Sequence, residues 1–195
     1  MTASAMRVLA RLVLLSVLAC TGDAGARGDA DVPGAGPEAV LALSLAGYSL
    51  GPIGRTTPFE AGALERLFPA ASVTGAVGFT EGEAFRIYRV TAGDAVLDVR
   101  SMDGVSIHSV EIVDAAATGP LGALFGQSYL AVYNGVADPD CRPGMEEESG
   151  LVLCDAPSLP HVTLMFAGSW DGPDGRLPPR QTIASWIVER VIWRP

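Results

Sequence analysis

Residues 85–113 read FRIYRVTAGDAVLDVRSMDGVSIHSVEIV, and this stretch decides the fold class. It contains three strand-like runs, and in the middle run apolar residues alternate with Asp98 and Arg100. Such alternation is typical of a strand with one buried face. The dipeptide Asp103-Gly104 separates the second run from the third and indicates a hairpin. The sequence therefore predicts antiparallel strands at residues 85–90, 96–100 and 105–113.

A helix is expected immediately before these strands. In the stretch Thr57-Pro58-Phe59-Glu60, Thr57 suits the N-cap, Pro58 the first helical position and Glu60 the third, which together make a capping box. Apolar residues continue at helical spacing to Phe68, where Pro69 ends the pattern.

The second half of the chain resembles the first. Residues 119–122, GPLG, echo residues 51–54, GPIG, and apolar strand runs follow at 162–166 and 188–193. We therefore predict an α+β domain made of two degenerate repeats, 51–113 and 119–195, each a helix followed by antiparallel strands. The alternative is a chance likeness between glycine-rich turns.

Composition limits the classes of function. The chain has 195 residues and a net charge of −9, and all 13 basic residues are arginine. An acidic chain lacks the basic face that nucleic-acid binding requires. The lack of lysine excludes P-loop and Schiff-base chemistry. We expect a single domain at residues 39–195.

The first 20 residues have the order of a secretory signal peptide. Arg7 and Arg11 precede an apolar run that is too short to span a membrane. Residues 17–20, VLAC, resemble the lipobox of bacterial lipoproteins, in which the cysteine carries the lipid. We therefore predict lipidation, including palmitate, at Cys20; the alternative is a plain signal peptide with a chance cysteine. Residues 21–38 are rich in Gly, Ala, Asp and Pro and are expected to form a flexible tether.

Two further cysteines, Cys141 and Cys154, flank an acidic loop. In an oxidising compartment such a pair favours a disulfide, and closing a loop of this size contributes about 3 kcal/mol of stability in the chain-entropy model. The alternative is a metal site, but no neighbouring Cys or His completes one. We expect no metal site and no cofactor.

No catalytic constellation is recognisable. His108 and His161 are the only histidines, and neither belongs to a known nucleophile or metalloprotease motif. We therefore expect no catalytic residues and no enzymatic activity.

Residues 168–194, GSWDGPDGRLPPRQTIASWIVERVIWR, form the most distinctive stretch. The cluster at 171–175 predicts a turn and lacks the closing Glu of a calcium loop. Trp170, Trp186 and Trp193 are a candidate ligand or partner surface. The interpretation that we favour is packing, because an indole buries much apolar area.

This stretch resembles the YfeY-like family of proteobacterial lipoproteins, a family of unknown function. The resemblance covers roughly residues 50–195 and includes the lipobox, Thr57-Pro58, Gly119-Pro120 and the cysteine pair. Two departures are Arg or apolar residues at the family's lysine positions and a second helix start without Thr-Pro. The family supplies no catalytic residues. The resemblance implies a small α+β domain on an outer-membrane lipoprotein.

Together these features predict a lipoprotein held to the outer membrane by its lipid and facing the periplasm of a Gram-negative bacterium. We expect a non-enzymatic protein-interaction or envelope-maintenance module, with an unknown envelope protein as partner. The alternative is a small-ligand-binding lipoprotein, and a hydrolase is less favoured. No residue decides the oligomeric state.

Overall fold

The computed structural model describes residues 43–46, 48–80, 82–113 and 120–195. The described residues all belong to one compact unit, Gly36–Pro195. The predicted signal segment with Cys20 and the tether of residues 21–38 therefore lie outside the described residues. Within the described ranges, no helix is long and apolar enough to cross a membrane.

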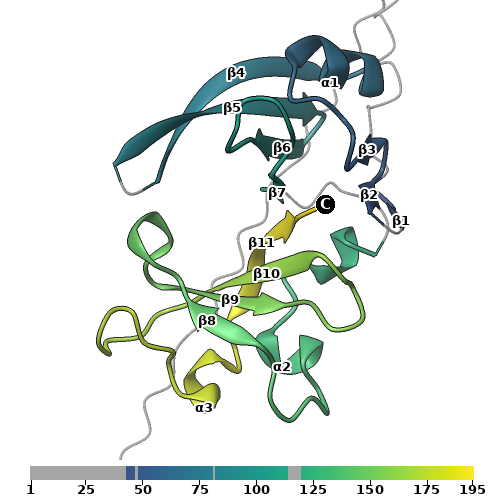
Figure 1. Ribbon diagram of the computed structural model, residues 1–195. Helices are drawn as coiled ribbons and strands as arrows, with labels where there is room; N and C mark the ends of the chain where they lie inside the picture. Colours follow the sequence, from purple (N-terminus) through teal and green to yellow (C-terminus); the bar gives the residue numbers. More distant parts are fainter. Residues whose placement is uncertain (1–42, 47, 81, 114–119) are drawn as a thin grey trace, which may run out of the picture. The chain divides into compact units, whose positions relative to one another are not determined.

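An eight-stranded antiparallel sheet is the main element (Figure 1). Its strands are β4 (Ser72–Thr80), β5 (Glu83–Ala92), β6 (Ala95–Arg100), β7 (Ser109–Ile112), β8 (Cys141–Pro143), β9 (Leu151–Asp155), β10 (Val162–Ala167) and β11 (Ile187–Trp193). They lie in the order β4-β5-β6-β7-β11-β10-β9-β8. Each half of the sheet is thus a meander of four consecutive strands, and the last strands of the two meanders pair with each other.

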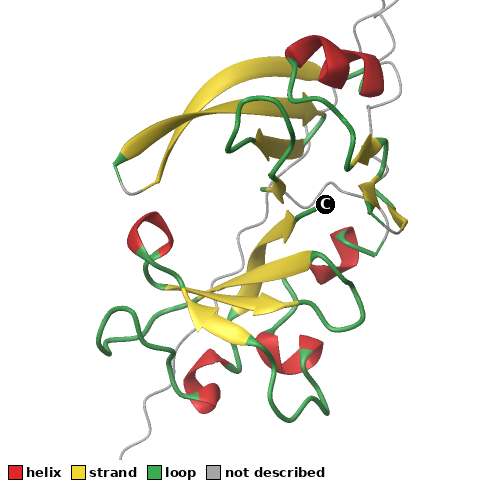
Figure 2. Cartoon of the chain, viewed as in Figure 1, coloured by secondary structure: helices red, strands yellow, loops and turns green. Residues whose placement is uncertain are grey.

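The remaining elements are short (Figure 2). A separate three-stranded sheet consists of β1 (Leu45–Ala46), β2 (Ser49–Leu50) and β3 (Ile53–Gly54). The helical segments are α1 (Ala61–Leu67), η1 (Gly122–Leu124), α2 (Tyr129–Val132), η2 (Glu146–Glu148) and α3 (Arg180–Ile183). The fold is therefore α+β, with antiparallel strands supplying most of the regular structure.

The predicted capping box at Thr57 is wrong. Helix α1 begins at Ala61, and its N-cap residue Glu60 makes no side-chain cap. The Thr57 hydroxyl instead accepts a hydrogen bond from the backbone N–H of Gly54. Pro58 forms an isolated β-bridge with Ser106, which holds this segment extended and delays the helix.

The third predicted strand is shorter than residues 105–113, because β7 begins only at Ser109. The cause is Asp103, whose Oδ1 accepts hydrogen bonds from the backbone N–H groups of Val105 and Ser106, both at 2.8 Å. Its Oδ2 accepts from the Ser106 hydroxyl at 2.6 Å. These bonds lower the pKa of Asp103 well below its ordinary value, and the bond from the Ser106 hydroxyl has the largest effect. They hold residues 103–106 in a loop rather than a strand.

Strand β4 is absent from the sequence-based prediction. Glycine weakens a strand pattern, and β4 contains both Gly75 and Gly78. The neighbouring strand explains the second glycine, because Gly78 lies opposite Phe85 in the register. A Cβ atom on Gly78 would lie 2.5 Å from the Phe85 Cζ atom, so the aromatic ring occupies the space that a side chain would need.

The predicted helix-then-strands repeat remains a prediction. Each meander follows a helix in the chain, α1 before β4 and α2 before β8. The two helices differ, however, since α1 has seven residues and α2 has four, and only α2 has a side-chain cap, at Ser128.

The main core lies on one face of the sheet. An aromatic group of Tyr129, Tyr133 and Phe166 packs there with ring centroids 4.9 to 5.9 Å apart. Burial raises the pKa of Tyr133, and its protonated hydroxyl donates a hydrogen bond to the carbonyl of Asp155 at 2.8 Å. This bond ties α2 to strand β9 through the core.

The opposite face of the sheet carries a row of charges. Asp98 on β6 and Glu111 on β7 lie opposite each other in the register, and both are buried. Arg89 pairs with Asp98 through two bonds of 2.7 Å. Arg100 and Arg190 both pair with Glu111. Because Arg190 comes from β11, Glu111 links the two meanders electrostatically.

We predict that Glu111→Gln lowers the free energy of unfolding by ~3 kcal/mol, because removal of one member of a buried ion pair leaves the remaining charge uncompensated. Chemical denaturation monitored by circular dichroism measures this. The matched control is Glu189→Gln, since Glu189 is exposed on β11, the strand that pairs with β7. Equal stability of the two variants would contradict the structural role of Glu111.

Candidate functional site

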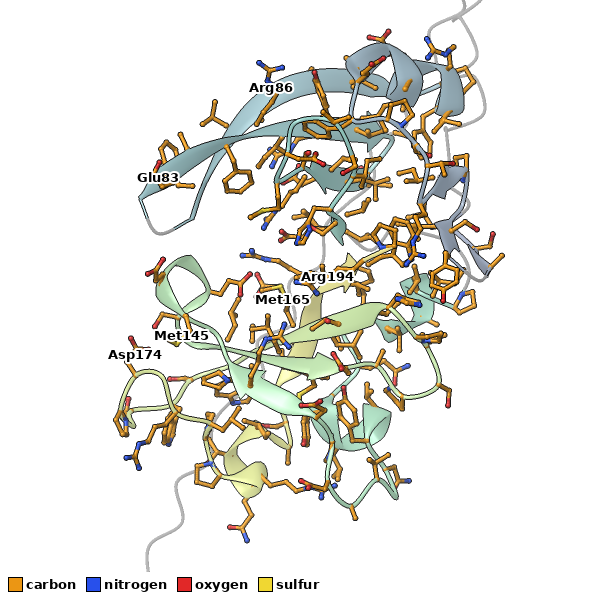
Figure 3. The ribbon with its side chains drawn as sticks, in the orientation of Figure 1. Glu83, Arg86, Met145, Met165, Asp174 and Arg194 are labelled. Carbon is orange, nitrogen blue, oxygen red and sulfur yellow. A yellow bond between two sulfur atoms is a disulfide. The ribbon has the colours of Figure 1, made fainter. Side chains whose placement is uncertain are left out.

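The distinctive C-terminal stretch forms one wall of a cavity of about 340 Å³. The loop after β10 contributes Trp170, Asp174 and Arg176, and Trp186 lies just before β11. The loop between β8 and β9 supplies the opposite wall, including Gly144, Ser149 and Gly150. We call this cavity the motif pocket. Figure 3 shows Met145 of the β8–β9 loop and Asp174 of the motif loop at neighbouring positions.

Two glycines of the motif make room for the tryptophans. A Cβ atom on Gly168 would lie 2.1 Å from the Trp186 Nε1 atom. A Cβ atom on Gly172 would lie 1.9 Å from the Trp170 Cζ2 atom. Each indole therefore packs directly against the backbone, and no larger residue fits at either glycine.

A hydrogen bond closes the motif pocket across its two walls. The Ser149 hydroxyl donates to Asp174 Oδ1 at 2.6 Å, which joins the β8–β9 loop to the turn at residues 171–175. Gly144 allows the backbone of the same loop to approach itself closely, because a Cβ atom there would lie 1.9 Å from the carbonyl oxygen of Glu148. Hydroxyl, carboxylate and guanidinium groups beside an indole provide both polar and stacking contacts for a small polar molecule.

The structure separates the three candidate tryptophans. Trp170 and Trp186 line the motif pocket, Trp170 half-buried and Trp186 buried. Trp193 instead lies fully buried in the main core, so it offers no surface to a ligand. Its indole N–H has no hydrogen-bond partner among the residues that the structure describes.

Cys141 and Cys154 form a disulfide between neighbouring strands. They are direct partners in the β8–β9 register. The bridge fixes the base of the loop that forms one wall of the motif pocket. Elsewhere in the described residues, no group of three or more His, Cys, Asp or Glu side chains is placed to hold a metal ion.

The two histidines lie apart from the motif pocket. His108 is exposed beside the Asp103 loop, in a hollow that also contains Ser106 and Arg194. The His161 ring packs against Tyr48, with centroids 4.7 Å apart. In the described part of the chain, neither imidazole is hydrogen-bonded to a Ser, Asp or Glu side chain.

Comparison with known proteins assigns the family. A family described as "Protein of unknown function (DUF1131)" matches residues 41–195. The chain belongs to this family. The predicted resemblance to a YfeY-like family of unknown function is thereby confirmed.

The sequence and the structure of this DUF1131 chain both resemble YfeY of Escherichia coli, which is uncharacterised. The Escherichia coli (strain K12) "Uncharacterized protein YfeY" is 28% identical over 113 residues, which cover 58% of this chain and 59% of the relative. The matched stretch thus spans less than two thirds of that protein. The "Crystal structure of the uncharacterized protein yfeY from Escherichia coli" has a TM-score of 0.58 at 23% identity, covering 74% of this chain and 95% of the other. This likeness shows the fold alone.

The sequence of this DUF1131 member indicates one wall of the motif pocket and gives no sign of the other. The motif residues stand together in the chain and include two tryptophans, which makes them conspicuous. Ser149 and Gly144 come from a distant loop, and nothing in their local sequence indicates that they face Trp170. The cysteine pair was the available signal, since the predicted disulfide brings the two ends of that loop together.

We predict that Gly168→Ala destabilises this DUF1131 protein by about 1–3 kcal/mol, because the new methyl group overlaps the Trp186 ring and forces it to move. Thermal unfolding followed by tryptophan fluorescence measures both the loss of stability and the ring's displacement. The matched control is Gly54→Ala, where a Cβ atom would meet nothing within 4 Å. A Gly168→Ala protein as stable as the control would show that the close packing is dispensable.

Proposed function

We propose that this chain is a lipoprotein, acylated at Cys20 and held to the periplasmic face of the outer membrane. The support is the order of residues 1–20: two arginines, an apolar run and a cysteine at its end. The Cys141–Cys154 disulfide agrees with an oxidising compartment. Two or more acyl chains suffice for stable attachment, so an acidic domain needs no basic surface to stay at the membrane.

Within that setting, we propose a non-enzymatic protein-interaction module whose contact surface is the β4–β5 hairpin. The observation that carries this proposal is the free edge of β4. Among the described residues, this nine-residue strand pairs on one side only, with β5. Its sequence, SVTGAVGFT, contains no charged residue and no proline, the residues that usually protect an exposed edge.

The apolar pattern of β4 continues beyond the core. Val73, Val77 and Phe79 alternate along the strand and share the face on which Val90 is fully buried. Val73 packs against the core, whereas Val77 is 65% exposed and Phe79 is 58% exposed. The hairpin therefore presents apolar side chains and unpaired backbone groups together, which is what an added strand needs.

The other edge of the same sheet differs. Strand β8 has three residues, and these include Pro143 and Arg142. Proline cannot donate a ladder hydrogen bond, and a charged residue opposes further pairing. Strand addition is thus favoured at β4, and the partner that fits is an extended, uncharged segment of an envelope protein with alternating apolar side chains.

The alternative is a small-ligand-binding lipoprotein, and the observation that favours it is the motif pocket. Its volume of about 340 Å³ lies within the range of ligand sites, and Trp170 lines it beside polar groups. A hydrolase is less favoured, because the imidazoles of His108 and His161 have no hydrogen-bonded nucleophile or carboxylate in the described residues.

We also propose that the two meanders descend from a duplicated helix-and-strand unit. The support is the strand order, in which β4–β7 and β11–β8 mirror each other about the β7–β11 pair.

For the lipid anchor, we predict that labelled palmitate is incorporated into the wild-type chain and that Cys20→Ser abolishes both this label and outer-membrane fractionation. The thioether-linked lipid requires the sulfur, so a hydroxyl cannot replace it. Ser16→Ala, a small change within the apolar run, is the control and should retain the label. An unlabelled wild-type chain would exclude the anchor.

For the interaction surface, we predict that Val77→Glu abolishes in-cell crosslinking of the full chain to its protein partner, because a charge on the hairpin opposes strand addition. The control is Leu130→Glu, since Leu130 is 57% exposed on α2, away from β4. Protection of the β4 backbone amides from hydrogen exchange in the crosslinked complex would identify strand pairing. Equal crosslinking by the two variants, or a crosslink only to lipid, would refute this surface.

A further inference from the structure

A second cavity, of about 520 Å³, lies on the charged face of the sheet at its C-terminal strand. We call it the Arg194 cavity. Its polar lining consists of Arg142, Asp155, His161, Thr163 and Arg194. In Figure 3 the labelled Arg194 and Met165 mark this region of β10 and β11.

The strand register explains why these residues meet. Thr163 on β10 lies opposite Asp155 on β9 and opposite Ile192 on β11. Arg194 is two residues beyond Ile192 and therefore shares its face. By the same alternation, Arg142 on β8 shares the face of Asp155, because Arg142 lies opposite Leu153.

The arginines on this face fall into two groups. Arg89, Arg100 and Arg190 each form an ion pair with Asp98 or Glu111. Arg142 and Arg194 have no carboxylate within ion-pair distance among the described residues. Two guanidinium groups that form no ion pair within the described ranges therefore face one cavity in a chain whose net charge is −9.

Arg194 is held in place by neutral groups. Its Nη1 donates to the Thr163 hydroxyl at 3.2 Å, and Thr163 is buried. That hydroxyl in turn donates to Asp155 Oδ1 at 3.4 Å. The contact with Thr163 positions the guanidinium and leaves its other N–H groups available to a ligand.

The surroundings make the charge of Arg194 costly. Burial is the main cause that lowers the pKa of Arg194, and the positive charges of Arg142 and Arg100 lower it further. Glu148 and Asp155 act in the opposite direction without forming an ion pair with it. A bound anion would relieve both the desolvation and the repulsion between Arg142 and Arg194.

His161 also lines the Arg194 cavity, and its backbone conformation is strained. Its φ angle is 69°, in the left-handed region that residues other than glycine rarely adopt. The backbone N–H of Arg194 donates to the carbonyl of His161 at 2.9 Å, and Tyr48 packs against the ring. Such a conformation persists only where the surrounding structure enforces it, and it keeps the imidazole at the cavity.

We propose that the Arg194 cavity binds a phosphoryl group through the guanidinium groups of Arg142 and Arg194 and the imidazole of His161. A phosphoryl group carries more charge and more acceptor oxygens than a carboxylate, which matches donors arriving from β8, β11 and the loop before β10. The group comes from a soluble phosphate or from a phospholipid headgroup, and its chemistry is the same in both cases. This proposal is independent of the β4 surface and of acylation at Cys20.

The test uses the full chain in neutral detergent and isothermal titration calorimetry with inorganic phosphate. We expect saturable binding with a Kd on the order of 1 mM or tighter. Arg142→Gln, which changes an exposed side chain, should weaken it about tenfold. Arg194→Gln should do the same, and Arg66→Gln on α1 is the control that should bind as the wild type does. Circular dichroism verifies the fold of each variant.

A second arm distinguishes the two sources. Mixed micelles containing phosphatidylglycerol displace phosphate if the site accepts a lipid headgroup, and diacylglycerol micelles of equal concentration, which carry no phosphoryl group, control for micelle effects. Displacement by phosphatidylglycerol assigns a lipid ligand, and no displacement assigns a soluble phosphate. The proposal is overturned if the wild-type chain binds neither probe, or if Arg142→Gln, correctly folded, binds phosphate as tightly as the wild type.

Discussion

The pairing of β7 with β11 is the constraint on which the rest of the structure depends. Three residue pairs form this contact, and they join the end of the first meander to the end of the second. Because strand side chains alternate, the same few residues serve both faces: Val110 and Trp193 enter the core, and Glu111 meets Arg190 on the other side. Glu111 and Arg190 are 79 residues apart in the chain. Without this pairing, neither the continuous core nor the charged row could form.

The elements of the fold that could be predicted from the sequence are those set by interactions between residues close together in the chain. Strands β5, β6, β10 and β11 carry local alternation or apolar runs, and the sequence indicated all four. The cysteine pair was found in the same way, from chemistry and spacing. The errors at Thr57 and Asp103 have a common cause, since each side chain bonds to nearby backbone in a loop whose shape is enforced by a distant contact. The Pro58–Ser106 bridge is such a contact, and no local pattern encodes it.

The motif pocket shows a different limit. Gly172 belongs to the turn predicted at residues 171–175, and the structure shows that both Gly172 and Gly168 lie against an indole. A glycine selected for turn conformation and one selected for close packing look alike in a sequence. Only the residue that packs against the glycine distinguishes the two cases. For Gly168 that residue is Trp186, which lies 18 residues further along the chain. The spacing of the motif residues follows from packing, because each of these glycines must lie where an indole of the same stretch contacts the backbone.

The use of arginine in place of lysine has a structural counterpart on the charged face. Arg89 holds Asp98 through two parallel hydrogen bonds, which a planar guanidinium forms and an ammonium group does not. The carboxylate of Glu111 accepts from Arg100 and Arg190 at the boundary of the two meanders. A guanidinium is more weakly hydrated than an ammonium group, so its partial burial in a sheet face costs less. The same property allows Arg194 to remain half-buried while its guanidinium bonds, among the described side chains, to the Thr163 hydroxyl alone. A chain that builds its sheet around guanidinium groups thus acquires, where Arg142 and Arg194 face one cavity without forming an ion pair to a described carboxylate, a place suited to an external anion.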